Sequence, residues 1–425
     1  MSARLRQALR WIGQHILLLL LLTLLALTIT REGPPSGALS TGVGRTIADV
    51  RFDFWGWEAE AVWTKFTHWL LQPQRYMEEA DRVAFVRDYA ALIGRIRELR
   101  WRIETAYVNP EVTDPKAATA QMRAKWLRLQ AEAAARQPVV EAIIEEQVGL
   151  VLAREGLGFL GQPFPQVGIR FTPLPYALIV SPRERIETVC HQHLRHGLDL
   201  AQQEALEAQI DTAFDVSSLV TPIGGMSAWP AMLLEENYLP WVLEVTAHEW
   251  THHYLGLHPL GWEYDRRQET RTINETTASI VGKEVGRRVL ARYYPDLLPP
   301  EETQPSQPQE PSDPPAFDFR AEMHKTRVEV DRLLAEGRVE EAERYMEERR
   351  QFFWENGYRI RKLNQAYFAF HGSYADRPGA AGEDPVGPAV RHLWEQSPGL
   401  RAFLARVRDI TTLEELQAAL AAMED

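Results

Sequence analysis

The first part of the chain carries apolar positions at helical spacing. One series recurs every three or four residues and so lies on a single helix face: Val83, Val86, Ala90, Ile93 and Ile96. The same pattern predicts helices over residues 53–71, 78–107, 116–136 and 139–154, with Pro138 at the start of the last one. Residues 46–155 therefore form a helical region, and we interpret its aromatic and apolar stripes as packing surfaces.

After Gly156 the pattern changes to short apolar runs between glycines and prolines, which is typical of β-strands. We expect strands over residues 168–171, 177–181, 216–223 and 226–234. Longer helical patterns then cover residues 240–255 and 267–294. Together with the helical region before it, this part of the chain predicts an α+β protein that is mostly helical.

Seven prolines and no large apolar residue occur between positions 299 and 315, so residues 299–316 are expected to be a linker or exposed loop. Beyond it, residues 317–336 and 339–355 predict a helical hairpin that turns at Gly337. Residues 317–425 are thus expected to be a C-terminal helical region.

The N-terminus has the pattern of a membrane signal anchor. Three arginines precede an apolar run from Trp11 to Ile29, which is close to the roughly 20 residues that span a bilayer. Because no clear cleavage site follows, we expect residues 1–31 to be an uncleaved anchor, with a cleaved signal as the alternative. Positive residues stay cytoplasmic, which would place the rest of the chain outside the cytoplasm, after a tether at residues 32–45.

Composition narrows the possible partners. The 425 residues include 47 Lys and Arg against 59 Asp and Glu, so the net charge is −12, which argues against nucleic acid as a partner. The apolar and charged fractions are those of an ordinary folded protein. The single cysteine, Cys190, excludes an intrachain disulfide.

The candidate chemistry begins with His248-Glu249-Trp250-Thr251-His252, an H-E-x-x-H sequence inside a predicted helix. Positions i and i+4 share one helix face, so His248 and His252 can direct their imidazoles at one metal ion. Glu249 is then placed to act as general base towards a water molecule at that ion. Zinc in catalytic sites has three protein ligands and one open position, so a third ligand is needed.

Two residues compete as the third ligand. Glu275 follows His252 by 22 residues, on a helix that can return antiparallel to the first. His258 lies ten positions after His248, the spacing of the H-E-x-x-H-x-x-G-x-x-H zincins. In those enzymes a glycine occupies the position that is Leu255 here, and the nearest glycine is Gly256.

The pair His248-Glu249-x-x-His252 and Asn274-Glu275 resembles the gluzincin metallopeptidases, the broad group that includes thermolysin-like enzymes and zinc aminopeptidases. The resemblance covers about residues 216–290. It implies a zincin-like catalytic core over residues 156–298, with a small mixed sheet, an active-site helix and a glutamate helix. It also implies Zn²⁺ held by His248, His252 and Glu275, with Glu249 as the base. In thermolysin-like enzymes an aspartate behind the metal ligands orients a histidine, and the corresponding position here is Ser279. The residues that orient the two histidines are therefore unassigned.

The zinc aminopeptidases carry a Gly-x-Met-Glu-Asn strand before their zinc helix, and Gly224-Gly225-Met226-Ser227-Ala228 occupies the corresponding place. Ser227 replaces the glutamate that binds the substrate amine in that family, so an aminopeptidase specificity is not supported; Glu235 and Glu236 are weak substitutes. We expect the backbone of Gly225, Met226, Ser227 and Ala228 to bind an extended peptide by strand addition.

The family also uses a Tyr or His from a later segment to stabilise the oxyanion. Tyr374 and His371 are the candidates here, so the C-terminal region is expected to complete the active site. The segment Cys190-His191-x-His193-x-x-His196 is expected to be a polar hairpin or loop rather than a metal cluster.

The sequence thus predicts a membrane-anchored zinc metallopeptidase that hydrolyses peptide bonds in a peptide or protein substrate. One alternative is a catalytically inactive zincin-fold protein that binds or scaffolds. Another is a metzincin-like peptidase in which His258 is the third ligand.

Overall fold

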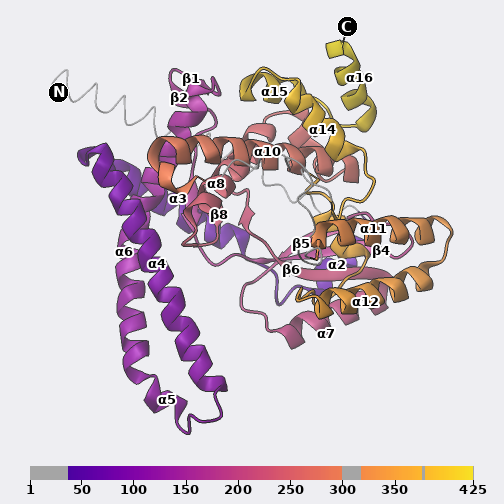
Figure 1. Ribbon diagram of the computed structural model, residues 1–425, viewed down its shortest axis with the longest axis horizontal. Coiled ribbons are helices and arrows are strands. Elements are labelled where there is room, and N and C mark those ends of the chain that lie inside the picture. The colour runs from indigo at the N-terminus through magenta and orange to yellow at the C-terminus, as the bar shows by residue number, and fades with distance from the viewer. Residues whose placement is uncertain (1–36, 299–316, 376–378, 425) are drawn as a thin grey trace, which may run out of the picture.

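The computed structural model describes residues 37–298, 317–375 and 379–424. These ranges are mostly helical and hold three small sheets, which confirms the α+β, mostly helical class (Figure 1). The helices are α2 (Ala38–Thr46), α3 (Phe54–Leu71), η1 (Pro73–Tyr76), α4 (Glu79–Val108), α5 (Pro115–Ala118), α6 (Ala120–Arg154), α7 (Leu200–Phe214), α8 (Leu239–Leu255), α9 (Pro259–Trp262), α10 (Gln268–Tyr293), η2 (Pro295–Leu297), α11 (Phe319–Ala335), α12 (Val339–Glu355), α13 (Gln365–His371), α14 (Val386–Glu395), α15 (Leu400–Val407) and α16 (Leu413–Glu424). The strands are β1 (Gly158–Phe159), β2 (Gln162–Pro163), β3 (Ile169–Phe171), β4 (Tyr176–Pro182), β5 (Cys190–Leu194), β6 (Val216–Pro222), β7 (Gly225–Met226) and β8 (Ala231–Leu233).

The largest hydrophobic core lies around α8 and α10. Buried side chains from α4 and α6 join it on one side, and side chains from α14, α15 and α16 join it on the other. Figure 1 shows α4 and α6 as a long pair that extends away from this core, while α14–α16 lie beside α10. Helices distant in sequence therefore hold α8 and α10 in place.

Helix α6 corrects one prediction. Residues 116–136 and 139–154 were expected to form two helices, but Ala120–Arg154 is a single helix with Pro138 inside it. An internal proline removes one helical hydrogen bond and costs about 3 kcal/mol. Ala133 before it and Val140 and Ile143 after it are all buried in the same core, and this packing holds both halves on one axis.

The sheet β5-β4-β6 is antiparallel and is covered on both faces. Leu178 and Val180 of β4 pack with side chains of α2 and α7, and the alternate residues Ala177 and Ile179 pack with α13. The segment expected to be a polar hairpin or loop contains β5, which pairs with β4.

The second three-stranded sheet has the order β3-β8-β7, with β3 parallel and β7 antiparallel to β8. One predicted strand, residues 226–234, is thus two strands with a reversal between them. Glu145 and Glu141 of α6 accept the N–H groups of Ile169 and Phe171, which covers the outer edge of β3. Lys65 of α3 lies 2.8 Å from Glu141 and 2.6 Å from Glu145 and forms an ion pair with both. Strand β7 is the outermost strand at the opposite edge.

The membrane predictions need correction. None of the helices in the described ranges combines the length and the apolar character that crossing a bilayer needs. The predicted anchor, residues 1–31, lies outside the described residues, as do the linker at 299–316 and the start of the tether. The rest of the predicted tether, from Ala38, belongs to helix α2. The predictions of a membrane partner and of an extracytoplasmic location are therefore not supported.

Candidate metal centre

Helices α8 and α10 approach each other closely, and glycines on α10 allow it. A Cβ atom at Gly282 would lie 2.8 Å from the backbone oxygen of Glu244 and 3.2 Å from Cβ of His248. A Cβ atom at Gly286 would lie 3.1 Å from Cα of Glu244. Because a larger residue would separate the two backbones, these glycines set the distance between the histidine helix and the glutamate helix.

This approach brings three potential ligand atoms together. Nε2 of His248 and Nε2 of His252 are 3.1 Å apart. Oε2 of Glu275 lies 3.4 Å from the first nitrogen and 3.5 Å from the second. Tetrahedral zinc with bonds of about 2.0–2.2 Å holds its ligand atoms about 3.3–3.6 Å apart. The two His–Glu separations fall in this range and the His–His separation is slightly shorter, so the donor set can hold a zinc ion with a small adjustment of the imidazoles.

Asn274 fixes the protonation pattern of His252. Its side-chain nitrogen donates to the carbonyl oxygen of Leu260, so its oxygen faces Nδ1 of His252 at 2.7 Å. Nδ1 must then carry the imidazole proton, which leaves a lone pair on Nε2 for a metal ion. Asn274 thus fills the orienting role that the sequence left unassigned, although the residue itself was part of the quoted motif.

Glu249 lies beside these ligands and is buried. Desolvation raises the pKa of its carboxyl group, while His248 and His252 act in the opposite direction. A Cβ atom at Gly225 would lie 2.2 Å from Oε1 of Glu249, so a larger residue at this point of β7 would displace the Glu249 carboxylate. The candidate base and the outermost strand of the sheet are therefore in direct contact.

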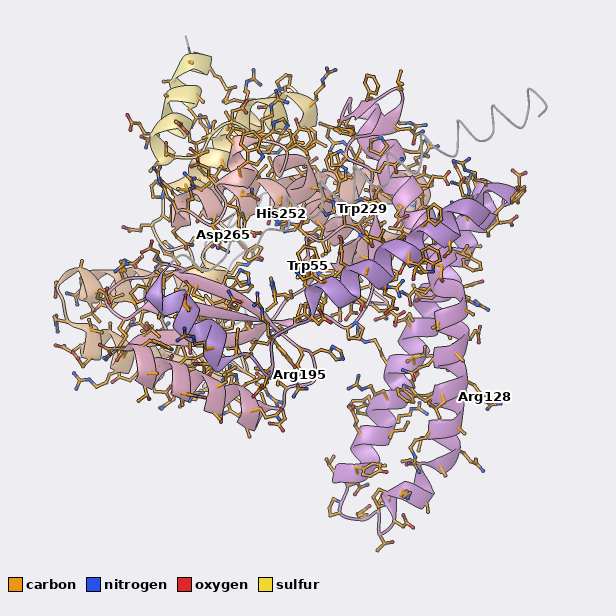
Figure 2. All side chains as sticks on the ribbon, turned by 180° about the vertical axis from the view of Figure 1, so that it is seen from behind. Trp55, Arg128, Arg195, Trp229, His252 and Asp265 are labelled. Carbon is orange, nitrogen blue, oxygen red and sulfur yellow. The ribbon has the colours of Figure 1, made fainter. Side chains whose placement is uncertain are left out.

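The predicted substrate-binding segment, residues 225–228, lies along α8. Gly225 and Met226 form β7, Ser227 has a buried hydroxyl, and the carbonyl of Ala228 accepts a 2.6 Å hydrogen bond from Nε2 of His253. Burial lowers the pKa of His253 to about 4, so this imidazole is neutral and serves as a structural donor. In Figure 2, His252 is labelled between Trp229, which follows this segment, and Asp265.

Two tyrosines contact Glu275. The hydroxyl of Tyr264, in the loop before α10, donates to Oε1. The hydroxyl of Tyr374, which follows α13, also reaches Glu275, and its ring stacks on His248 with centroids 6.3 Å apart. Burial and the nearby carboxylates raise the pKa of Tyr374. The residue as a whole is 37% exposed, so Tyr374 lies at the boundary between the buried triad and solvent.

The other residues that the sequence offered for the site make contacts away from the triad. His371 packs its ring on Tyr367 and Phe370, and burial lowers its pKa to about 4. His258 packs on Tyr254 and is not among the residues that converge at the metal centre. Glu235 accepts a hydrogen bond from Tyr89 and Glu236 pairs with Arg97, both on α4. These contacts leave Glu275 as the third ligand that fits the geometry.

The sequence did not identify Tyr264 or Arg271 as site residues. Arg271 stands one turn before Glu275 on α10, and its guanidinium lies 4.5 Å from the centre of the Tyr264 ring. The four-residue spacing of Arg271 and Glu275 was a usable signal for a shared helix face. Tyr264 lies in a loop, where spacing gives no comparable signal.

Comparison with protein-family models, curated proteins and solved structures found no match for this chain.

Proposed function

We propose that this protein is a zinc metallopeptidase with a zincin-like core that hydrolyses peptide bonds. The observation that carries the proposal is the convergence of His248, His252 and Glu275 at zinc-ligand spacing, with the carboxylate of Glu249 beside them.

The surroundings of the triad support this function. An extended peptide that adds to the outer edge of β7 would pass the carboxylate of Glu249, because Gly225 is in contact with it. The glutamate covering of β3 leaves β7 as the edge of this sheet at which a strand can add. A small sheet, an active-site helix and a glutamate helix are the parts that the resemblance to gluzincins implies.

Zinc held by the triad would supply a Lewis acid that polarises a peptide carbonyl and activates water. Glu249 takes the proton from the attacking water and passes it to the leaving amine. We assign the hydroxyl of Tyr374 as the donor for the oxyanion of the tetrahedral intermediate, because its ring stacks on His248 and the residue is partly exposed.

The test is zinc content and hydrolysis of a mixed peptide library, measured on the same preparations. Wild type is expected to bind one zinc ion and to cleave peptides. Glu249→Gln should keep the zinc and lose about 10²–10⁴-fold in rate, because only the proton transfer is removed. Tyr374→Phe should also keep the zinc and lose about 10²–10³-fold.

Glu275→Gln is expected to lose zinc, and Glu284→Gln is its matched control on the same helix. Glu284 pairs with Arg288 and lies outside the triad, so its substitution should change neither zinc nor rate. Zinc binding without any hydrolysis that depends on Glu249 would refute the peptidase and leave an inactive zincin-fold binding protein. Absence of zinc from the wild type would refute the metal centre.

A further inference from the structure

A second polar cluster adjoins the metal centre on the side of β5. Arg271 precedes Glu275 by one turn on the same face of α10, and its side chain is buried. Nη2 of Arg271 donates to Asp265, whose side chain is 65% exposed. The other terminal nitrogen, Nη1, lies 3.5 Å from Nδ1 of His191 on β5. The cluster therefore joins the edge of the antiparallel sheet to the glutamate helix.

This contact determines which nitrogen of His191 carries a proton. A guanidinium has donors only, so Nδ1 must accept and Nε2 must carry the hydrogen. Burial, His193 and Arg271 lower the pKa of His191 well below its ordinary value, which agrees with a neutral ring. Nε2 is buried and has no hydrogen-bond acceptor among the described residues.

A buried N–H without an acceptor is costly, and here it lies near a buried guanidinium. Carbonyl and carboxylate oxygens could both accept from it. The guanidinium of Arg271 beside His191 favours the carboxylate, because only one of its two terminal nitrogens is used by Asp265. Arg271 also lies over the ring of Tyr264, whose hydroxyl donates to Glu275, so the cluster adjoins the triad.

We propose that Nε2–H of His191, oriented by Arg271, binds a carboxylate of the substrate close to the scissile bond. The proposal rests on the proposed peptidase function and names its substrate class: peptides with a free C-terminal carboxylate, or with an Asp or Glu side chain, next to the cleaved bond. His191 is the binding residue and Arg271 is a positioning residue, because it acts through His191.

The test measures binding without turnover. Full-length protein with Glu249→Gln and ¹⁵N-labelled histidine is titrated with N-acetyl-trialanine and with its C-terminal amide, while the imidazole Nε2–H signals are followed by NMR. The His191 signal is assigned by its loss in His191→Gln. The free acid is expected to shift this signal and to bind at least about tenfold more tightly than the amide, as one charge-assisted hydrogen bond predicts.

A second pair, N-acetyl-Ala-Glu-Ala-amide and its Gln counterpart, separates the two sources of the carboxylate. Selectivity in the first pair alone indicates a free C-terminus, and selectivity in the second indicates an acidic side chain. Arg271→Gln should abolish the preference for the carboxylate in whichever peptide pair shows it. If the Gln variant does not fold, Arg271→Lys is measured in its place. His196→Gln, an exposed histidine just beyond β5, should leave selectivity unchanged.

Equal binding of acid and amide in both pairs, or no shift of the His191 signal by any of the four peptides, would overturn the carboxylate subsite. Because this assay needs no hydrolysis, a failure of the peptidase proposal shows separately, as zinc-loaded wild type that cleaves no peptide.

Discussion

At the scale of single residues, side chains behind the ligands decide whether the metal centre can form. Nε2 of His252 keeps its lone pair for a metal ion because Nδ1–H donates to the side-chain oxygen of Asn274, and Asn274 itself donates to the carbonyl of Leu260. The ligand pattern alone does not contain this information. A search for H-E-x-x-H finds the candidate ligands, but whether His252 can bind a metal ion through Nε2 depends on Asn274, a residue of another helix.

Replacement of Asn274 tests this dependence. Asn274→Ala is expected to lower zinc affinity about 10–100-fold, because the imidazole loses the acceptor that fixes its orientation. Asn274→Asp should retain the affinity, since a carboxylate still accepts the Nδ1 proton. Competition with a chelator of known affinity measures both variants. Equal affinity of the Ala and Asp variants would contradict the role assigned to Asn274.

Glu58 on α3 provides a test by pH. Its side chain is buried, it accepts the backbone N–H of Trp229, and burial raises its pKa to about 8 from an ordinary value of 4.5. The raised pKa means that its contribution to stability is complete below pH 4.5 and is lost as the pH rises through about 8.

Glu58→Gln stays neutral, so its stability relative to wild type should rise between pH 4.5 and pH 8, by about 5 kcal/mol at most. Urea unfolding at a series of pH values measures the difference. Glu60→Gln, at a position whose side chain is 74% exposed on the same helix, should show no such trend. A difference for Glu58→Gln that does not change with pH would rule out a buried neutral carboxyl group.

At the scale of elements, the spacing of α8 and α10 is the feature on which the site depends. Gly282→Ala should destabilise the protein by about 1–3 kcal/mol and weaken zinc binding, because the added methyl group meets the backbone of Glu244. Gly44→Ala in α2 is the matched control: nothing lies within 4 Å of its added Cβ. That change should be neutral or stabilise by about 0.5–1 kcal/mol. Thermal unfolding and zinc titration are measured for both variants. An equal loss of stability in Gly282→Ala and Gly44→Ala would contradict a specific role for the glycine at the contact of α8 and α10.

Several long helices could be predicted from the sequence because their patterns are local. Helix α8 was expected over residues 240–255 and is Leu239–Leu255, and α10 was expected over 267–294 and is Gln268–Tyr293. Two missed features have different causes, one in distant contacts and one in the local pattern. Pro138 does not end α6 because packing on both sides of it continues, and β5 was not predicted because its two histidines and a glutamine obscured the alternation of buried residues.

The residues of the candidate site also fall into two groups, those that the local sequence predicts and those that only the fold brings together. His248, Glu249 and His252 lie within one and a half turns, so the sequence itself places them on one helix. Glu275 and His258 were both candidates for the third position, and the fold brings Glu275 to the two histidines. His191 and Arg271 are 80 residues apart, and only the packing of β5 near α10 brings them into contact.

At the scale of the whole molecule, the centre joins parts of the chain that belong to different cores. The triad lies on helices of the largest core, whereas Tyr374 follows α13, which packs on the antiparallel sheet. A ligand that holds these parts in place should therefore stabilise the folded protein as a whole.

Removal of zinc is expected to lower the thermal midpoint. A zinc concentration 1,000-fold above the dissociation constant contributes about 4 kcal/mol to stability. The midpoint should fall when EDTA is added to wild type or to Glu249→Gln, and calorimetry measures the fall. Glu275→Gln should show no EDTA effect, because its triad is incomplete. The same EDTA effect in Glu275→Gln as in wild type would show that the stabilising metal sits elsewhere.

The carboxylates of Glu141 and Glu145 have one further consequence. Four residues on a helix rise about 6 Å, close to the spacing of two alternate N–H groups along a strand, so one helix face can seal the edge of β3. An unsealed strand edge invites other chains to pair with it and aggregate. The two glutamates close this edge of the sheet, so another chain cannot pair with β3 and extend the sheet into a fibre.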